Sequence, residues 1–116
     1  EGLIIPTGFA PITPEAKRVA DGVAKRYKGN VDLHSAAVWE NMMALKQIIE
    51  SVGIEAQPTT VAKDRKKIRE GLANLKEFQG LLGKITRTPD RESVKPYVFA
   101  QVKGSEWAVL YDARSK

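Results

Sequence analysis

The sequence Phe-Gln-Gly-Leu-Leu-Gly-Lys-Ile, residues 78–85, divides the chain into two parts with different hydrophobic periodicity. Before this stretch, apolar residues recur every three or four positions, which is typical of amphipathic helices. After it, the side chains alternate with a period of two, which is typical of strands. We interpret Gly80 and Gly83 as the residues that let the chain turn as it passes from helix into sheet.

Three helices are expected before this stretch. In the first, Thr13 suits the N-cap and Pro14 the first helical position, and Gly29 ends the helix. Asp64 is the expected cap of the third helix, in which Gly71 costs about 1 kcal/mol relative to alanine. The predicted buried stripe of the third helix consists of Ile68, Leu72 and Leu75.

The second helix is the longest of the three that we predict. It begins at Asp32 as its cap and ends at Gly53. Its predicted buried stripe consists of Val38, Met42, Leu45, Ile49 and Val52. Because Trp39 and Met43 add a second apolar edge, we expect this helix to be wedged between other elements.

Strands are predicted at both ends of the chain. The apolar run of residues 3–5 stops at Pro6 and predicts one short buried strand. Residues 84–86 predict a strand that ends at a turn over residues 88–90. Alternation over residues 97–111, interrupted at Lys-Gly-Ser, predicts a β-hairpin. The predicted order is therefore strand, three helices, strand and C-terminal hairpin, without internal repeats.

The composition excludes several classes of site. The chain has 116 residues, a length that suits one globular domain, and 42% of them are apolar. It has no cysteine and one histidine, which excludes disulfide scaffolds, cysteine zinc sites and any metal site that needs two imidazoles. We interpret His34 as structural or solvent-exposed, because no partner lies at a spacing that implies acid–base work. We therefore expect no catalytic residues, no metal, no cofactor and no enzymatic activity.

The chain is basic, with 19 Lys and Arg against 14 Asp and Glu and a net charge of +5. This balance makes nucleic acid or an acidic surface a partner to test. The densest basic cluster, residues 63–69, has no interleaved aromatic side chains of the kind that stack on single strands. We interpret it as a solvated helix face and keep a small basic α+β nucleic-acid-binding module as the alternative function.

Two further motifs have plain explanations. The loop at residues 80–84 lacks the glycine and the hydroxyl residue of a Walker loop, since Phe78 and Ile85 occupy those positions. As a Gly-x-x-Gly nucleotide clamp it would present Leu81 and Leu82 to solvent. The apolar run of residues 2–5 has no basic flank and is stopped by Pro6, so we expect neither a signal peptide nor a membrane span there.

Several segments together carry a resemblance to a known family. They are Gly-Leu-Ile-Ile-Pro at 2–6, Thr-Pro-Glu-Ala-Lys at 13–17, Lys-Arg-Tyr at 25–27, Ser-Ala-Ala-Val-Trp-Glu at 35–40, the stretch at 78–85, and Pro-Tyr-Val-Phe-Ala-Gln-Val at 96–102. In this order they resemble the C-terminal third of type I periplasmic solute-binding proteins, the branched-chain amino acid receptor group of ABC transporters. Trp39-Glu40-Asn41 stands where that group usually has Tyr-Asp-Ala, so ligand preference does not carry over.

The resemblance implies an α/β fold, here a portion of the type I periplasmic-binding-protein fold. Residues 1–116 would be the C-terminal fragment of a two-lobed protein in which each lobe is a parallel sheet flanked by helices. Residues 1–8 would be a hinge strand where the chain crosses between lobes, 13–76 the helical part and 77–116 the C-terminal strands. By position, Ala37, Val38 and Trp39 are the expected contributors to the wall of the ligand site. The groups that fix an amino acid's ammonium and carboxylate would lie upstream.

The resemblance also implies a function and partners. We expect the substrate-binding component of an ABC transporter, which binds a small amino acid of the branched-chain type or a related small carboxylate in the periplasm. The partners would be that small molecule and, for the full-length protein, the membrane permease. We do not favour nucleic acid as a partner. Because a fragment of this fold would leave sheet edges and apolar faces uncovered, a homodimer of the fragment is a further expectation.

Overall fold

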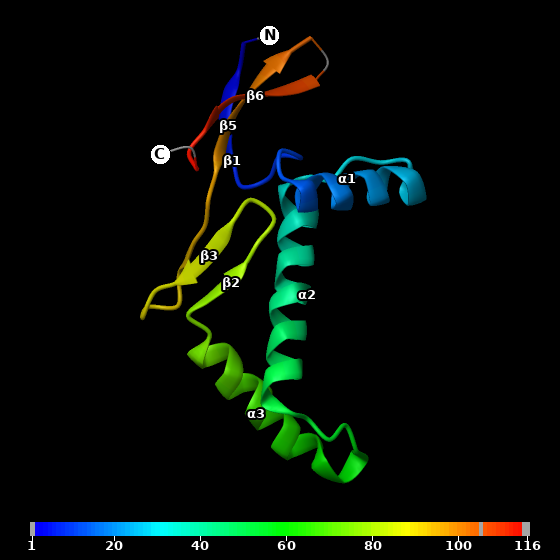
Figure 1. The fold of residues 1–116 in the computed structure, drawn as a ribbon, viewed down its shortest axis with the longest axis vertical. Coiled ribbons are helices and arrows are strands. Elements are labelled where there is room, and N and C mark those ends of the chain that lie inside the picture. The colour runs from blue at the N-terminus through cyan, green and yellow to red at the C-terminus, as the bar shows by residue number, and fades with distance from the viewer. Residues whose placement is uncertain (1, 105, 115–116) are drawn as a thin grey trace.

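The computed structural model describes residues 2–104 and 106–114, which form three long helices and two small sheets (Figure 1). The helices are α1 (Pro14–Tyr27), α2 (Leu33–Val52) and α3 (Val61–Asn74), and the short 3₁₀ helix η1 (Pro58–Thr60) precedes α3. The strands are β1 (Ile4–Thr7), β2 (Glu77–Gln79), β3 (Lys84–Arg87), β4 (Ser93–Val94), β5 (Val98–Lys103) and β6 (Glu106–Asp112). The predicted order of elements is confirmed, with β2, β4 and η1 as additions.

The start of α1 is capped as predicted. The Thr13 side chain accepts a hydrogen bond from the amide of Ala16 at 3.0 Å, and Pro14 occupies the first turn. The helix ends one residue earlier than expected, because Lys28 takes the left-handed conformation (φ 53°) and its amide donates to Ala24. A lysine therefore stands where we expected a glycine to end the helix.

The ends of α2 are as predicted, but its buried face is not. Asp32 caps the helix by accepting from the amide of Ser35 at 2.7 Å, and Gly53 ends it in the left-handed conformation. The buried residues are Ala36, Glu40, Ala44 and Ile48. Val38 and Met42 are 63% and 55% exposed, whereas Leu45, Ile49 and Val52 are half-buried, so the predicted stripe was wrong in its first half. The small residues at 36 and 44 let neighbouring elements approach closely, which apolar periodicity does not register.

Helix α3 begins at Val61, three residues before the predicted cap. Asp64 instead lies buried inside the first turn and accepts from the amides of Glu55 and Ala56 and from Oγ1 of Thr60, at 2.9–3.1 Å. Burial acts to raise the pKa of this carboxyl, but the hydrogen bonds outweigh it and hold the pKa below its ordinary value. Asp64 thus fixes the loop before α3 rather than the helix end itself.

Gly71 lies where α3 packs against α2. A Cβ atom at this position would come within 2.6 Å of Cγ2 of Ile48 and 3.0 Å of Cγ1 of Val52. The glycine that weakens α3 as an isolated helix is therefore the residue that allows the two helices to touch.

The strands form two separate antiparallel sheets of three strands, with the orders β1-β5-β6 and β2-β3-β4. The predicted C-terminal hairpin is confirmed as β5–β6, with a bulge between Phe99 and Ala100. The prediction that the first strand is buried was wrong, because Leu3 is 60% and Ile4 46% exposed. The parallel sheets expected of complete lobes are not formed by these strands.

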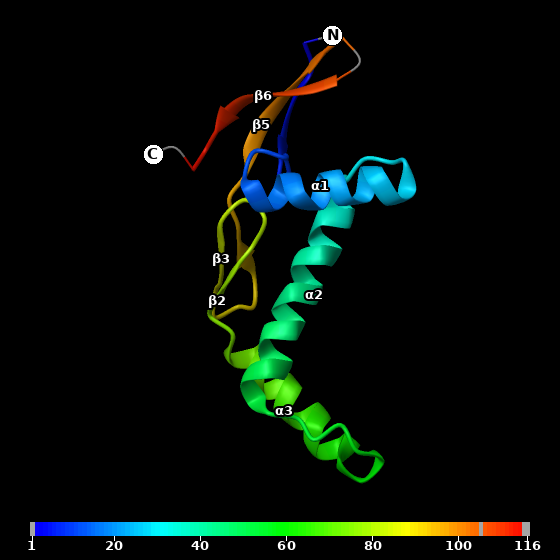
Figure 2. The same ribbon diagram turned by 45° about the vertical axis from the view of Figure 1, so that its right-hand side comes forward.

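The chain is extended rather than globular, so the expectation of one compact domain was wrong. A compact domain of this length has a radius of gyration of about 13 Å, whereas this chain has one of 17.1 Å and extents of 57 × 35 × 20 Å. Figure 2 shows α1 crossing the start of α2, α3 at its far end, and the β1-β5-β6 sheet beyond α1. The buried apolar residues form two small clusters, one around Phe9 and Leu81 and one around Leu82 and Val98.

Candidate functional site

The expected wall residues lie in the first turns of α2, below α1 (Figures 1 and 2). Because successive residues of a helix point about 100° apart, the three side chains face different directions. Trp39 is half-buried and packs against the cluster of Phe9, Ala16, Ala36 and Leu81. Val38 faces solvent, and Ala37 is half-buried. Their role in a ligand site stays a prediction.

Glu40, one position after these residues, is the buried charge of this region. Only 3% of it is exposed, so its carboxylate is withdrawn from solvent. Its Oε1 accepts from the amide of Leu81 at 2.9 Å, and its Oε2 accepts from Nζ of Lys95 at 2.8 Å. Buried carboxylates are tolerated when both oxygens have such partners.

Both backbone polar groups of Leu81 are hydrogen-bonded to side chains. Its amide donates to Glu40, and its carbonyl accepts from Oγ1 of Thr13 at 2.6 Å. Since Thr13 is also the N-cap of α1, one hydroxyl joins the start of α1 to the loop between β2 and β3. Leu81 and Leu82 are each 1% exposed, so this loop packs into the protein instead of facing solvent as a nucleotide clamp would.

Gly80 permits this close packing. A Cβ atom there would come within 2.6 Å of Cδ1 of Ile85 and 2.8 Å of Oε1 of Glu40. The amide of Gly80 also donates to the carbonyl of Gly83 at 2.9 Å. The stretch at 78–85 is therefore a tight β-hairpin turn docked on α2, rather than only a turn from helix into sheet.

The same network reaches β1 and β5, the two paired strands that precede and follow the helical body, residues 8–97, in the sequence. Lys95 precedes β5, and a Cβ atom on Gly8 at the end of β1 would come within 2.9 Å of its Cε. Thr7 and Val98 are paired in the antiparallel ladder of β1 and β5. The residues beside Trp39 thus connect to the place where the chain leaves and re-enters the helical body.

The remaining candidates have local partners. His34 is exposed. In the basic cluster of residues 63–69, Lys63 pairs with Glu55, Lys66 lies 3.9 Å from Glu70, and Lys67 donates to the carbonyl of Gly53. These contacts fit a solvated helix face.

Three aromatic side chains at β5 and β6 pack on one another. Phe99 lies edge to face with Tyr97 at 5.6 Å between ring centroids, and at 6.2 Å from Tyr111. In residues 2–104 and 106–114, no group of three or more His, Asp or Glu side chains is placed to hold a metal ion. Across the same residues, no helix combines the length and apolar character needed to cross a bilayer.

Residues 1–106 match a family model described as periplasmic binding protein. A comparison with curated proteins found no match.

Solved structures share the fold. The leucine-binding protein LivK from Thermotoga maritima is 23% identical with a TM-score of 0.72, over 100% of this chain and 32% of that one. An ABC transporter solute-binding protein from R. palustris, solved with benzoate, is 17% identical with a TM-score of 0.75, over 97% and 30%. LivJ from Streptococcus pneumoniae, solved with isoleucine, is 18% identical with a TM-score of 0.69, over 93% and 30%. The chain therefore spans about a third of the length of these proteins.

Proposed function

Because the chain belongs to the periplasmic binding protein family, we propose that it is part of the substrate-binding component of an ABC transporter. The ligand is a small amino acid of the branched-chain type or a related small carboxylate. The observation that carries the proposal is the family match over residues 1–106 together with the shared fold. The role is that of a receptor that binds and releases its ligand unchanged.

Residues 1–116 correspond in this proposal to the C-terminal part of a two-lobed receptor. Residues 1–8 form a hinge strand, 13–76 the helical part and 77–116 the C-terminal strands. The pairing of β1 with β5 supports the hinge, because both connections of the helical body to the hairpin run side by side there. The share of about a third of the related structures supports the assignment as a part.

Ala37, Val38 and Trp39 form a wall of the ligand site in this proposal. The exposed Val38 and the half-buried indole of Trp39 offer the apolar surface that a branched side chain or an aromatic ring requires. Glu40 is a positioning residue for this wall, since its carboxylate fixes α2 against the loop at Leu81. The ligands bound in the related structures, isoleucine and benzoate, combine a carboxylate with such an apolar part.

The mechanism follows from differential binding. A ligand that touches both lobes has more contacts in the closed than in the open state, so binding shifts the population toward closure. The strands β1 and β5 bend while the Glu40 network keeps the helical body rigid on its side of the hinge. The membrane permease reads the closed state, and the receptor works in the periplasm.

The exposed edge strand β6 supports the proposal of a homodimer for this fragment when it is studied alone. Trp107 and Leu110 are each about half exposed, and strand edges of this kind pair with a second copy. Gel filtration of the fragment is expected to show a dimer, and a cooperative melt of a clean monomer would contradict this proposal.

Two tryptophans provide the test of ligand binding in the intact protein that carries this chain. Trp39 lies in the proposed wall, and Trp107 lies on β6. Leucine, isoleucine, valine and benzoate are titrated by calorimetry and by tryptophan fluorescence. We expect saturable binding of at least one of them, a fluorescence change that persists in W107F and a change that is lost in W39F.

Different results contradict different parts of this proposal. Saturable binding with an unchanged W39F response removes Trp39 from the wall but leaves the receptor function. If none of the four compounds binds while the protein melts cooperatively, the proposed ligand class is wrong.

A further inference from the structure

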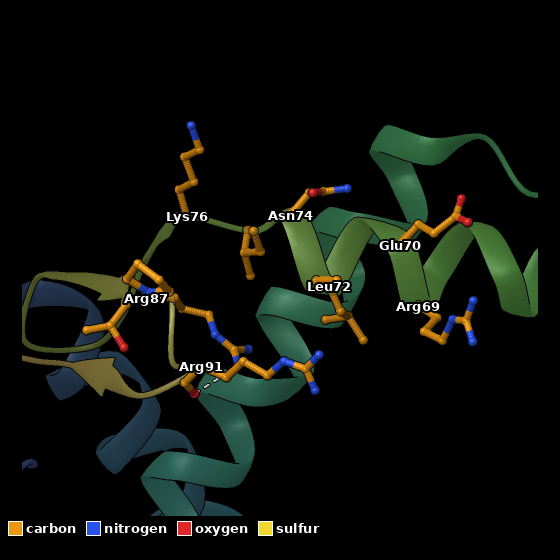
Figure 3. Close-up of a pocket in the computed structure, with 11 residues that line it drawn as sticks. Arg69, Glu70, Leu72, Asn74, Lys76, Arg87 and Arg91 are labelled. Atoms are coloured by element: carbon orange, nitrogen blue, oxygen red, sulfur yellow. Dashed lines mark hydrogen bonds between the residues drawn. The ribbon is translucent and has the colours of Figure 1, made fainter.

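A groove of about 1040 Å³ opens beside the last turns of α3. It lies between the last turns of α3, the connection to β2, and the turn between β3 and β4 (Figure 3). Four cationic side chains line it, together with the single acidic residue Glu70; the cations are Arg69, Lys76, Arg87 and Arg91. The groove is therefore strongly basic and separate from the proposed ligand wall.

Like several other cations of the chain, the four groove cations form no ion pair within the residues that the structure describes. Within residues 2–104 and 106–114, seven other Lys and Arg side chains form ion pairs, but none of these four lies within 4.0 Å of a carboxylate. Glu70 is directed to Lys66, at 3.9 Å. The positive charge of the groove is thus left for a partner outside this part of the chain.

Two arginines meet at one side of the groove. The guanidinium of Arg87 donates to the carbonyl of Arg91 at 3.2 Å, which holds both residues on the same turn. In Figure 3 their side chains extend toward Leu72 at the end of α3, whereas Lys76 points away from them. The two guanidinium groups therefore face the groove from its β3–β4 side.

Arg91 occupies a strained backbone position. Its φ is +67°, in the left-handed region that favours glycine, within a turn in which its amide donates to the carbonyl of Thr88. A large charged side chain at such a position costs folding stability, and strain of this kind is concentrated at functional sites. The strain is a second reason, independent of charge, to assign the turn a binding role.

The apolar part of the groove lining favours an acidic protein segment over nucleic acid or free phosphate. Guanidinium groups bind carboxylates and phosphates alike with two parallel hydrogen bonds, so the other lining residues decide between the two. Leu72, Leu75 and Pro89 add apolar surface between the arginines, and none of the lining residues is aromatic, as base stacking would require. The volume exceeds what one small anion fills and suits several residues of an extended segment.

We propose that this groove is a docking surface for an acidic segment of a partner protein. Arg87 and Arg91 bind its carboxylates from one side and Arg69 from the other, over the apolar floor at Leu72. The proposal does not depend on the ligand wall, because none of the residues that line the groove belongs to that wall.

The test uses the intact protein and a short labelled peptide of alternating glutamate and leucine. Anisotropy is measured at low and at moderate salt, beside the matched glutamine–leucine peptide, free glutamate, inorganic phosphate and a single-stranded oligonucleotide. We expect salt-dependent binding of the acidic peptide alone. Charge reversal in R87E/R91E is expected to weaken it by about tenfold or more, while the control K17E/K25E, with the same change of charge on α1, weakens it less than about twofold.

Arg91→Gly separates binding from folding. Glycine relieves the positive φ, so this variant is expected to melt at a temperature at least as high as the parent and still to bind the peptide more weakly. Equal losses in R87E/R91E and K17E/K25E, or unchanged affinity in R91G, overturn the assignment to these arginines. Saturation by phosphate or free glutamate, or tighter binding of the oligonucleotide, overturns the acidic protein segment as the occupant.

Discussion

The amide of Leu81 donates to Oε1 of Glu40 at 2.9 Å, and this buried hydrogen bond joins residues separated by 41 positions. It holds the turn between β2 and β3 against the side of α2 that carries Trp39. Lys95 forms an ion pair with the same carboxylate. Removing Glu40 therefore leaves a buried donor and a half-buried cation without their partner.

Glu40→Ala is expected to lower the free energy of unfolding by about 2 kcal/mol, the cost of an unsatisfied buried donor. Glu50→Ala is the matched control, since Glu50 lies on the same helix and forms an exposed pair with Lys46; it should change stability by less than about 0.5 kcal/mol. Urea unfolding of the intact protein measures both. Equal effects of the two substitutions would show that the Glu40 network contributes nothing beyond a surface pair.

Two helical glycines predict opposite outcomes for the same substitution. Gly71→Ala places a Cβ 2.6 Å from Ile48 and should destabilise the protein by about 1 kcal/mol or more, despite the better helix propensity of alanine. Gly22→Ala meets no atom within 4 Å and should stabilise α1 by up to about 1 kcal/mol. Thermal and urea unfolding compare the pair. Stabilisation by both substitutions would contradict the close approach of α2 and α3.

Thr13 combines two contacts in one hydroxyl. Thr13→Val keeps the shape but loses the cap of Ala16 and the bond to the Leu81 carbonyl, with an expected cost of about 1.5 kcal/mol. Thr13→Ser keeps the oxygen and should retain stability within about 0.5 kcal/mol. The comparison is made by urea unfolding, and equal losses in the two variants would contradict a specific role of the hydroxyl.

Asp64 predicts a pH dependence. Its folded-state pKa is lowered, with burial opposing the shift and the hydrogen bonds from Glu55, Thr60 and Ala56 producing it. Its contribution is therefore fully present above the ordinary carboxyl pKa and is lost as the pH falls through the lowered value. Asp64→Asn should melt at a lower temperature than the parent at neutral pH, and the difference should shrink in acid.

The control for this pH dependence is Asp21→Asn, on the exposed face of α1. It should follow the parent across the whole pH range. A difference between Asp64→Asn and the parent that stays constant in acid would contradict the charged form of Asp64 as the stabilising one.

Local signals predicted what depends on local geometry. The caps at Thr13 and Asp32 and the hairpin β5–β6 were predicted correctly, because capping and alternation are set by residues close in sequence. The buried face of α2 was predicted wrongly, since apolar residues surround this helix and only the neighbours that it meets decide which side is covered. Short strands such as β4 have too few residues to show a period.

In the candidate site, too, local sequence predicts some features, and residues far apart in the chain determine the others. The position of Trp39 near the start of α2 follows from the sequence, but the burial of Glu40 does not, because its partners Leu81 and Lys95 lie far along the chain. The signal that was available is the pair of glycines beside Leu81. A loop with glycine on both sides of two leucines can press its backbone against a helix, and such a loop needs an acceptor on that helix.

The ladder between β1 and β5 also limits how the helical body moves. Four residue pairs, from Ile4 and Gln101 to Thr7 and Val98, join the two connections edge to edge. A hydrogen-bonded ribbon of two strands bends and twists more readily than its strands slide past each other, because sliding breaks every bond of the ladder at once. The helical body therefore swings and rotates about β1 and β5 more easily than it slides along them.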